Sequence, residues 1–167
     1  TMVNWTIFKS PQASFKTFGA LLSKLQCSDA KGRALGGKGF ALALKMIQKQ
    51  TSARKKLMFI GNGGSAAIAS HAATDFFKNG GVRTLTFNDA SLITCLSNDY
   101  SYPEVFERPV ERMADKGDIL FAVSSSGRSP NILRAAAKGA KMGARVITLS
   151  GFGSDNDLRK MGEINFY

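Results

Sequence analysis

The sequence predicts an α/β fold, in which a parallel β-sheet lies between layers of helices. Short apolar runs alternate with helical patterns from residue 57 onward, and parallel strands need a helical crossover between one strand and the next. The run at residues 119–123 is nearly all apolar, as expected of a strand that is buried on both faces. Ligands of such sheets bind at the carboxyl ends of the strands, where the strand order reverses.

The apolar runs predict five strands, at residues 57–60, 82–87, 118–123, 145–149 and 163–167. Apolar residues at helical spacing, glycine stops and proline starts predict the helices before and between these strands. The helices are expected at residues 4–26 with a break at Pro11, after Gly36-Gly37, along the alanine-rich run that ends at Asn79, at 90–96, at 104–114, from Ser129 to Gly143, and at 157–161.

The length of 167 residues suits a single domain, with N-terminal helices over residues 1–53 and a sheet core over 54–167. The first two helices have no obvious place in an α/β sheet, yet they are rich in aromatic and aliphatic residues. We therefore expect them to pack against other subunits. The chain stops on a strand, which would leave one edge or face uncovered, so we also expect a C-terminal helix to be missing from this sequence.

Composition excludes a membrane protein and indicates a cytoplasmic one. No apolar run approaches the roughly 20 residues that cross a bilayer, and no basic segment followed by an apolar stretch marks a secretory signal. Cys27 and Cys95 are far apart, which provides neither a disulfide framework nor a paired-cysteine metal site. The net charge is +11, but the basic residues are scattered, which favours a solvated basic surface over a nucleic-acid-binding face.

A glycine-rich loop follows the first predicted strand, with the sequence Gly61-Asn62-Gly63-Gly64, and an alanine-rich helix begins at once. Glycines let a ligand approach the main chain closely. The free N–H groups and the dipole at the start of a helix favour an anion. The loop therefore fits a phosphate group, although a purely structural tight turn has the same pattern. It lacks the spacing of a dinucleotide-binding or Walker loop.

A serine-rich loop follows the third predicted strand and holds Ser124, Ser125, Ser126 and Ser129 before another helix. Their hydroxyls and the first N–H groups of the helix can donate hydrogen bonds to a phosphate dianion. The alternative is that Ser129 only caps its helix and the other serines only form the turn. The pattern does not match that of a nucleophilic serine. Two anion-binding loops in one sheet indicate a substrate with a phosphate and several hydroxyls.

His71 and Asp75 are four residues apart, which places both on one face of the expected helix, one turn beyond the glycine loop. They could bind a metal or act as an acid–base pair, or His71 could be an ordinary core residue. Two ligands are too few for a closed zinc site. Asn98 and Asp99 are expected in a polar loop, where Asp99 could hold sugar hydroxyls or simply form a turn.

Three stretches, at residues 59–75, 97–100 and 124–131, together resemble the phosphoheptose isomerases of the sugar isomerase (SIS) domain superfamily. The resemblance runs from the N-terminal helices to the last residue. It implies a flavodoxin-like αβα sandwich with a five-stranded parallel sheet, assembled as a cytoplasmic homotetramer with active sites at subunit interfaces. The implied reaction converts sedoheptulose 7-phosphate into D-glycero-D-manno-heptose 7-phosphate through a cis-enediol, for bacterial heptose and surface polysaccharide synthesis.

The resemblance also implies roles for individual residues. Asp75 corresponds to the catalytic base, and His71 with Asp75 corresponds to the zinc ligands of members that bind zinc. The positions that would bind substrate are Asn62, Gly63, Gly64, Asn98, Asp99, Ser124, Ser125, Ser126 and Ser129, with the serines on the phosphate and Asn98 and Asp99 on hydroxyls.

This sequence departs from the family at two points. The best-known members have glutamate at position 75, so the shorter Asp75 would need a closer substrate or a shifted helix. The family also continues into a final helix that carries a glutamine or glutamate and a histidine, and nothing after Tyr167 supplies them. The alternative function is that of a non-catalytic member, which would bind a phosphosugar or a partner protein such as a replication initiator.

Overall fold

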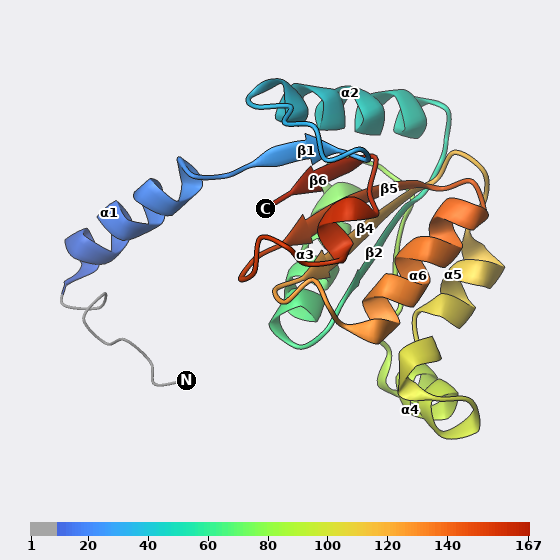
Figure 1. The fold of residues 1–167 in the computed structure, drawn as a ribbon. Coiled ribbons are helices and arrows are strands. Elements are labelled where there is room, and N and C mark those ends of the chain that lie inside the picture. Colours follow the sequence, from blue (N-terminus) through green and yellow to red (C-terminus); the bar gives the residue numbers. More distant parts are fainter. Residues whose placement is uncertain (1–9) are drawn as a thin grey trace.

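A computed structural model describes residues 10–167, and helices cover both faces of its central sheet (Figure 1). The six strands are β1 (Cys27–Asp29), β2 (Leu57–Gly61), β3 (Thr84–Thr86), β4 (Ile119–Ser124), β5 (Arg145–Ser150) and β6 (Ile164–Phe166). They lie in the order β1-β6-β5-β4-β2-β3. Strands β2 to β6 are parallel, and β1 pairs with β6 in the antiparallel sense. The predicted fold and its five parallel strands are therefore confirmed, with one additional edge strand.

The helices are α1 (Pro11–Leu22), α2 (Lys38–Ser52), α3 (Gly64–Lys78), α4 (Ala90–Asp99), α5 (Glu107–Met113) and α6 (Pro130–Lys141), with short 3₁₀-helices η2 (Tyr102–Glu104) and η3 (Leu158–Lys160). Helices α2 and α3 pack on one face of the sheet, through Ala43, Met46 and Ala69 among others. Helices α5 and α6 pack on the opposite face, through Val110 and Ile132 among others, and α4 packs against the same apolar core.

Local sequence signals explain where the helices begin. The Ser10 hydroxyl accepts a hydrogen bond from Ala13 N at 3.1 Å, and Pro11 occupies the first turn, so α1 begins at Pro11. The predicted helix over residues 4–26 is confirmed only from Pro11 to Leu22, and its first residues, with Trp5 and Phe8, lie outside the described residues. The Asp89 carboxylate caps α4 in the same way, by accepting a hydrogen bond from Leu92 N at 3.0 Å.

Several predicted boundaries were wrong. Strand β1 was missed because its three residues carry no apolar pattern. The segment at 157–161 contains only one turn of 3₁₀-helix, and β3 covers three residues instead of six. Asn98 and Asp99, which we expected in a loop, form the last turn of α4.

An ion cluster around the buried Lys56–Asp118 pair joins the amino ends of β2 and β4. The Lys56 ammonium lies 2.6 Å from a carboxylate oxygen of Asp118 and 2.6 Å from one of Asp115. Asp118 is buried and also accepts hydrogen bonds from Lys56 N and Asp115 N, each at 2.8 Å. Burial by itself lowers the pKa of Lys56, but the hydrogen bonds to Asp115 and Asp118 outweigh it and raise that pKa. The cluster fixes the start of two neighbouring strands.

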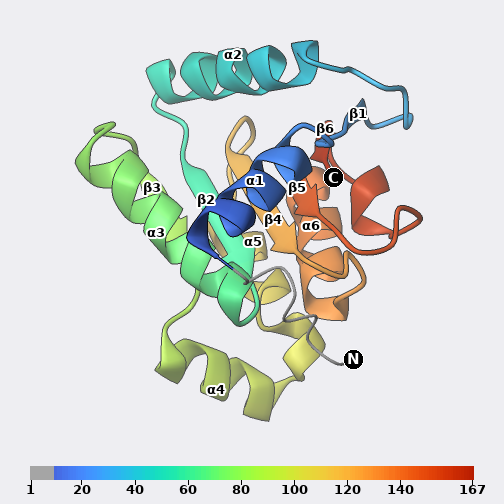
Figure 2. The same cartoon turned by 90° about the vertical axis from the view of Figure 1, so that its left-hand side faces the viewer.

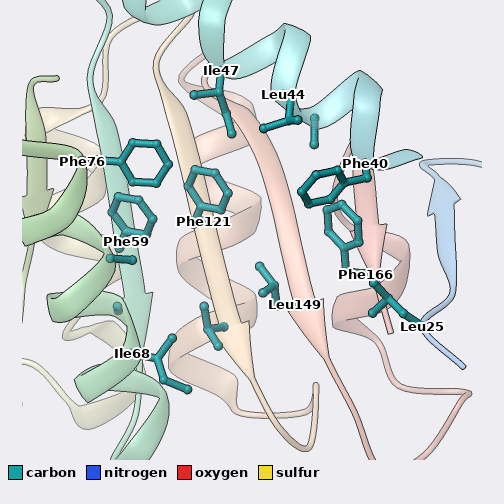
Figure 3. A pocket seen from close by; sticks show the side chains of 14 residues that line it. Leu25, Phe40, Leu44, Ile47, Phe59, Ile68, Phe76, Phe121, Leu149 and Phe166 are labelled. Atoms are coloured by element: carbon teal, nitrogen blue, oxygen red, sulfur yellow. The ribbon is translucent and has the colours of Figure 1, made fainter. Parts of the chain in front are cut away.

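The sheet face under α2 and α3 is not fully covered. An apolar groove of about 340 Å³ lies there, lined by Phe40 and Leu44 of α2, Ile68 of α3 and Phe121 of β4, among others (Figure 3). In Figure 2, α1 lies in front of the sheet between α2 and α3. No residue of α1 is buried, and its large exposed apolar residues are Phe15, Phe18, Leu21 and Leu22. Both surfaces are typical of segments that pack against another chain.

None of the helices within residues 10–167 has the length and apolar character required to cross a bilayer.

Candidate functional site

The two loops that we predicted to bind anions lie side by side. Strands β2 and β4 are hydrogen-bonded neighbours, and Gly61 at the end of β2 pairs with Val123 near the end of β4. The chain runs outward from β2 to β3 on one side, and from β4 to β5 and β6 on the other. The strand order therefore reverses between β2 and β4, which is where ligands of this architecture bind.

The glycine loop, residues 61–64, is held in a shape that few other residues allow. Gly63 has a φ of +52°, in the left-handed region that favours glycine. At Gly61, an added Cβ would lie 2.6 Å from the backbone carbon of Ser65, so only glycine fits between β2 and α3. The amide groups of Asn62 and Asn131 exchange two hydrogen bonds, at 3.0 and 2.9 Å. This pair ties the glycine loop to the start of α6.

The serine loop, residues 124–129, folds around Gly127, which has a φ of +61°. The Ser124 hydroxyl accepts a hydrogen bond from Gly127 N at 3.2 Å, and it lies 3.3 Å from the Ser129 hydroxyl. Ser129 occupies the N-cap position of α6 but makes no side-chain capping bond. Its hydroxyl therefore remains available to a ligand, in contrast to the interpretation in which it only caps the helix.

A cavity of about 220 Å³ lies between the two loops. The residues that line it are Asn62, Ser65, Ser124, Ser125, Ser126, Ser129 and Phe152. The amino ends of α3 and α6 both meet at this cavity, so two helix dipoles and several hydroxyls face one small volume. Among residues 10–167, no carboxylate lines it. This arrangement suits a phosphate dianion.

Sequence reasoning missed several residues of this site. Ser65 and Phe152 line the cavity, Asn131 pairs with Asn62, and the Tyr102 hydroxyl donates a hydrogen bond to the Asn62 carbonyl oxygen at 3.1 Å. Ser65 and Asn131 lie within the stretches that carry the family resemblance, so their positions after the two loops could have indicated them. Nothing local indicates Tyr102 or Phe152, because tertiary structure alone brings them to the loops.

His71 and Asp75 lie together, but not at the cavity. Their side chains are 3.4 Å apart, from Nε2 to a carboxylate oxygen, and both are exposed on α3. At 1.5 Å per residue, the ten residues from Ser65 to Asp75 span about 15 Å of helix. Asp75 is thus about three turns into α3, farther from the glycine loop than its sequence position suggested. Within residues 10–167, no three or more of the side chains that bind metals gather in one cluster.

Asn98 and Asp99 do not line the cavity. The Asn98 amide donates a hydrogen bond to the Asp99 carboxylate at 2.9 Å, and the Cys95 thiol lies 3.4 Å from the same carboxylate. The hydrogen bond to Asp99 and its negative charge raise the pKa of Cys95. Asp99 is followed within three residues by Tyr102, which contacts the glycine loop.

The fold and the paired loops define an α/β domain with a candidate anion site at the reversal of its sheet. The chain belongs to the SIS domain family, whose model matches residues 17–151. Within that family the chain resembles phosphoheptose isomerases. It is 40% identical over 120 residues to the "Phosphoheptose isomerase" of Campylobacter concisus, covering 67% of this chain and 62% of that protein. It is 38% identical over 141 residues to that of a Bradyrhizobium species, covering 81% of this chain and 69% of that protein.

A solved structure supports the same family. The phosphoheptose isomerase of Neisseria gonorrhoeae superposes with a TM-score of 0.74 at 26% identity, covering 90% of this chain and 78% of that one. The chain spans only about two thirds of the length of the two curated relatives, 62% and 69%.

Proposed function

We propose that the protein isomerises sedoheptulose 7-phosphate to D-glycero-D-manno-heptose 7-phosphate. The observation that carries this proposal is the cavity at the reversal point of the sheet, where serine hydroxyls and two helix amino ends converge. Its shape and chemistry fit the phosphate of a phosphosugar, and the similarity to phosphoheptose isomerases supports the particular substrate. The product is a precursor of the heptose in bacterial surface polysaccharides, and we propose that the protein works in the cytoplasm.

The chain's own residues supply binding and proton transfer. Ser124, Ser125, Ser126 and Ser129 hold the phosphate, and Asn62, Gly63 and Gly64 contact the rest of the substrate. Asn98 and Asp99 hold sugar hydroxyls. The Asp75 carboxylate removes the proton from the carbon next to the carbonyl while the carbonyl oxygen gains a proton, which yields a cis-enediol. The same carbon-bound proton then returns to the former carbonyl carbon, while the hydroxyl on the adjacent carbon loses its proton and becomes the aldehyde oxygen.

The proposed reaction requires more than one subunit, because Asp75 lies far from the cavity of its own chain. Because Asp75 lies about 15 Å along α3 from Ser65, it would act on a substrate held by the loops of another subunit. The apolar groove beside α2 and the exposed apolar side of α1 provide surfaces for such packing. We propose a homotetramer with active sites at its subunit interfaces.

A zinc ion is a further part of the proposal. His71 Nε2 and the Asp75 carboxylate are donors of the type that zinc prefers, and their 3.4 Å separation allows both to reach one ion. Because the described residues provide no third donor in the same cluster, the remaining ligands would come from another subunit or from a further segment of the protein. When bound, zinc would stabilise negative charge on the substrate oxygen. Zinc ligation would then compete with the role of Asp75 as base.

The test is incubation of the protein with sedoheptulose 7-phosphate, with and without zinc, followed by identification of any aldoheptose phosphate. We expect turnover, and we expect Asp75→Asn to lower kcat by about 10²-fold or more, as loss of a general base does, while the affinity for inorganic phosphate stays unchanged. Binding of the sugar phosphate without turnover in either condition would instead favour the non-catalytic alternative, a regulator that responds to a phosphosugar.

A further inference from the structure

The phosphate cavity has one wall that is not made of polar groups. Phe152, in the loop between β5 and η3, lines the cavity together with the serines, yet 83% of this residue is exposed. Its φ is +58°, a left-handed conformation that is costly for a residue with a large side chain. The protein thus holds an apolar ring in water, in a strained backbone conformation, beside an anion site.

The loop that carries Phe152 is fixed to the serine loop. Gly151 N donates a hydrogen bond to Ser125 O at 3.1 Å, and Leu158 N donates one to Gly127 O at 3.0 Å. The guanidinium of Arg128 pairs with Asp155 at 2.8 Å. These contacts before and after Phe152 prevent the loop from moving independently of the phosphate site.

Further contacts hold the tip of this loop. The Tyr167 hydroxyl donates a hydrogen bond to the carbonyl oxygen of Phe152 at 2.8 Å, and Arg159 donates one to Ser154 O at 3.0 Å. Inside the loop, the buried Asn156 side chain donates to Gly153 O at 2.8 Å. The backbone at Phe152 is therefore set by the surrounding structure, and the ring is presented at the mouth of the cavity.

The ring of Phe152 cannot bind the phosphate group itself, because it has no hydrogen-bond donor. It can pack against carbon-bound hydrogens, since the face of an aromatic ring carries partial negative charge and excludes water from an apolar contact. In a sugar phosphate, such hydrogens lie on the carbon chain directly beyond the phosphate oxygen. A phosphosugar whose phosphate fills the serine loop would place this part of its chain at the mouth of the cavity.

We propose that Phe152 is a specificity-determining residue. Its ring covers the carbon chain of the bound sugar phosphate, so that the site binds a sugar phosphate more tightly than inorganic phosphate. This inference rests on the proposed function, because it assumes that a sugar phosphate binds in the serine loop. It adds a residue outside the two loops and assigns it to the sugar, while the serines recognise the phosphate.

The test compares two ligands on three variants by isothermal titration calorimetry. Phe152→Asn removes the ring but tolerates a positive φ, so it preserves the loop. We expect it to weaken binding of sedoheptulose 7-phosphate about tenfold, the size of one good aromatic contact, and to leave the affinity for inorganic phosphate unchanged. Phe152→Tyr retains the ring and should bind both ligands as the unaltered protein does. Phe77→Ala removes another exposed phenylalanine, on α3, and should change neither affinity.

Each other outcome refutes the inference in a recognisable way. If Phe152→Asn leaves sugar phosphate binding unchanged, the ring does not contact the sugar. If Phe152→Asn weakens the binding of both ligands equally, the ring supports the serine loop instead of contacting the sugar. If it changes the oligomeric state by gel filtration while Phe152→Tyr does not, the ring belongs to a subunit contact. If the unaltered protein binds neither ligand, the proposed function itself is wrong, and the inference is wrong with it.

Discussion

Replacing Gly127 by alanine should disrupt the serine loop. The new Cβ would overlap the amide oxygen of Asn156 and lie 2.7 Å from the Asn156 Cβ. Asn156 is fully buried, and its amide bonds to Gly153 O, Ser150 Oγ and Arg159 N. Alanine can be accommodated only if that side chain moves and loses these contacts.

The expected loss of stability is the sum of two effects. Alanine at a φ of +61° costs about 1 kcal/mol, and three lost hydrogen bonds cost about 1 kcal/mol each. Gly127→Ala should thus lower the free energy of unfolding by about 4 kcal/mol. Gly81→Ala is the matched control, because Gly81 has the same φ of +61° and nothing within 4 Å of an added Cβ. The free energy of unfolding of Gly81→Ala should fall by only about 1 kcal/mol.

Urea unfolding followed by far-ultraviolet circular dichroism measures both values. The difference between the two variants, about 3 kcal/mol, isolates the contact with Asn156 from the backbone cost. Equal losses in the two variants would refute the reasoning, since they would mean that Asn156 moves aside without penalty. Calorimetry with inorganic phosphate should also detect weaker binding in Gly127→Ala and not in Gly81→Ala.

Three further results are expected. Ser129→Ala should weaken inorganic phosphate binding about tenfold, as loss of a hydrogen bond to a charged group does, yet barely change urea unfolding, because Ser129 makes no capping bond; a large loss of stability would contradict this. Asp118→Ala should lower the free energy of unfolding by about 4 kcal/mol, because it removes a buried partner of Lys56; a loss below about 1 kcal/mol in urea would show that the ion cluster does not stabilise the strands. The hydrogen bond from Lys56 lowers the pKa of Asp115 in the folded protein below its ordinary value of 3.8. The ionised Asp115 carboxylate therefore stabilises the fold fully above pH 3.8, and this stabilisation is lost as the pH falls through the lower, folded-state pKa. Asp115→Asn should accordingly reduce the fall in urea midpoint between about pH 5 and about pH 2, and an unchanged fall would show that another carboxylate causes it.

The parallel strands and the two loops could be predicted because their signals are local. Leu57 to Gly61 is an unbroken apolar run that ends in glycine, and every residue of it is buried. The serines at 124–129 follow a strand in the same way. Since adjacent parallel strands end at the same edge of a sheet, the neighbouring positions of β2 and β4 bring the two loops together.

The remaining features depend on contacts between distant parts of the chain. Strand β1 is recognisable only through its pairing with β6, in which Cys27 lies opposite Phe166. Phe152 reaches the cavity because its loop bonds to the serine loop, which no pattern in residues 151–157 indicates. The spacing of His71 and Asp75 correctly predicted their contact. Their expected place one turn beyond the glycine loop was wrong, because Asp75 lies about three turns into α3.

The pairing of β1 with β6 has a consequence for how the chain folds. Asn165, which is fully buried, donates a hydrogen bond to Asp29 O at 3.2 Å, across 136 positions of sequence. Tyr167 and Gln26 exchange two backbone hydrogen bonds at the same edge. During synthesis, residues 26–29 leave the ribosome before their partners in β6 exist, so β1 can pair only after β6 has been made. Until β1 pairs with it, β6 is a sheet edge with unpaired backbone groups, which favours aggregation.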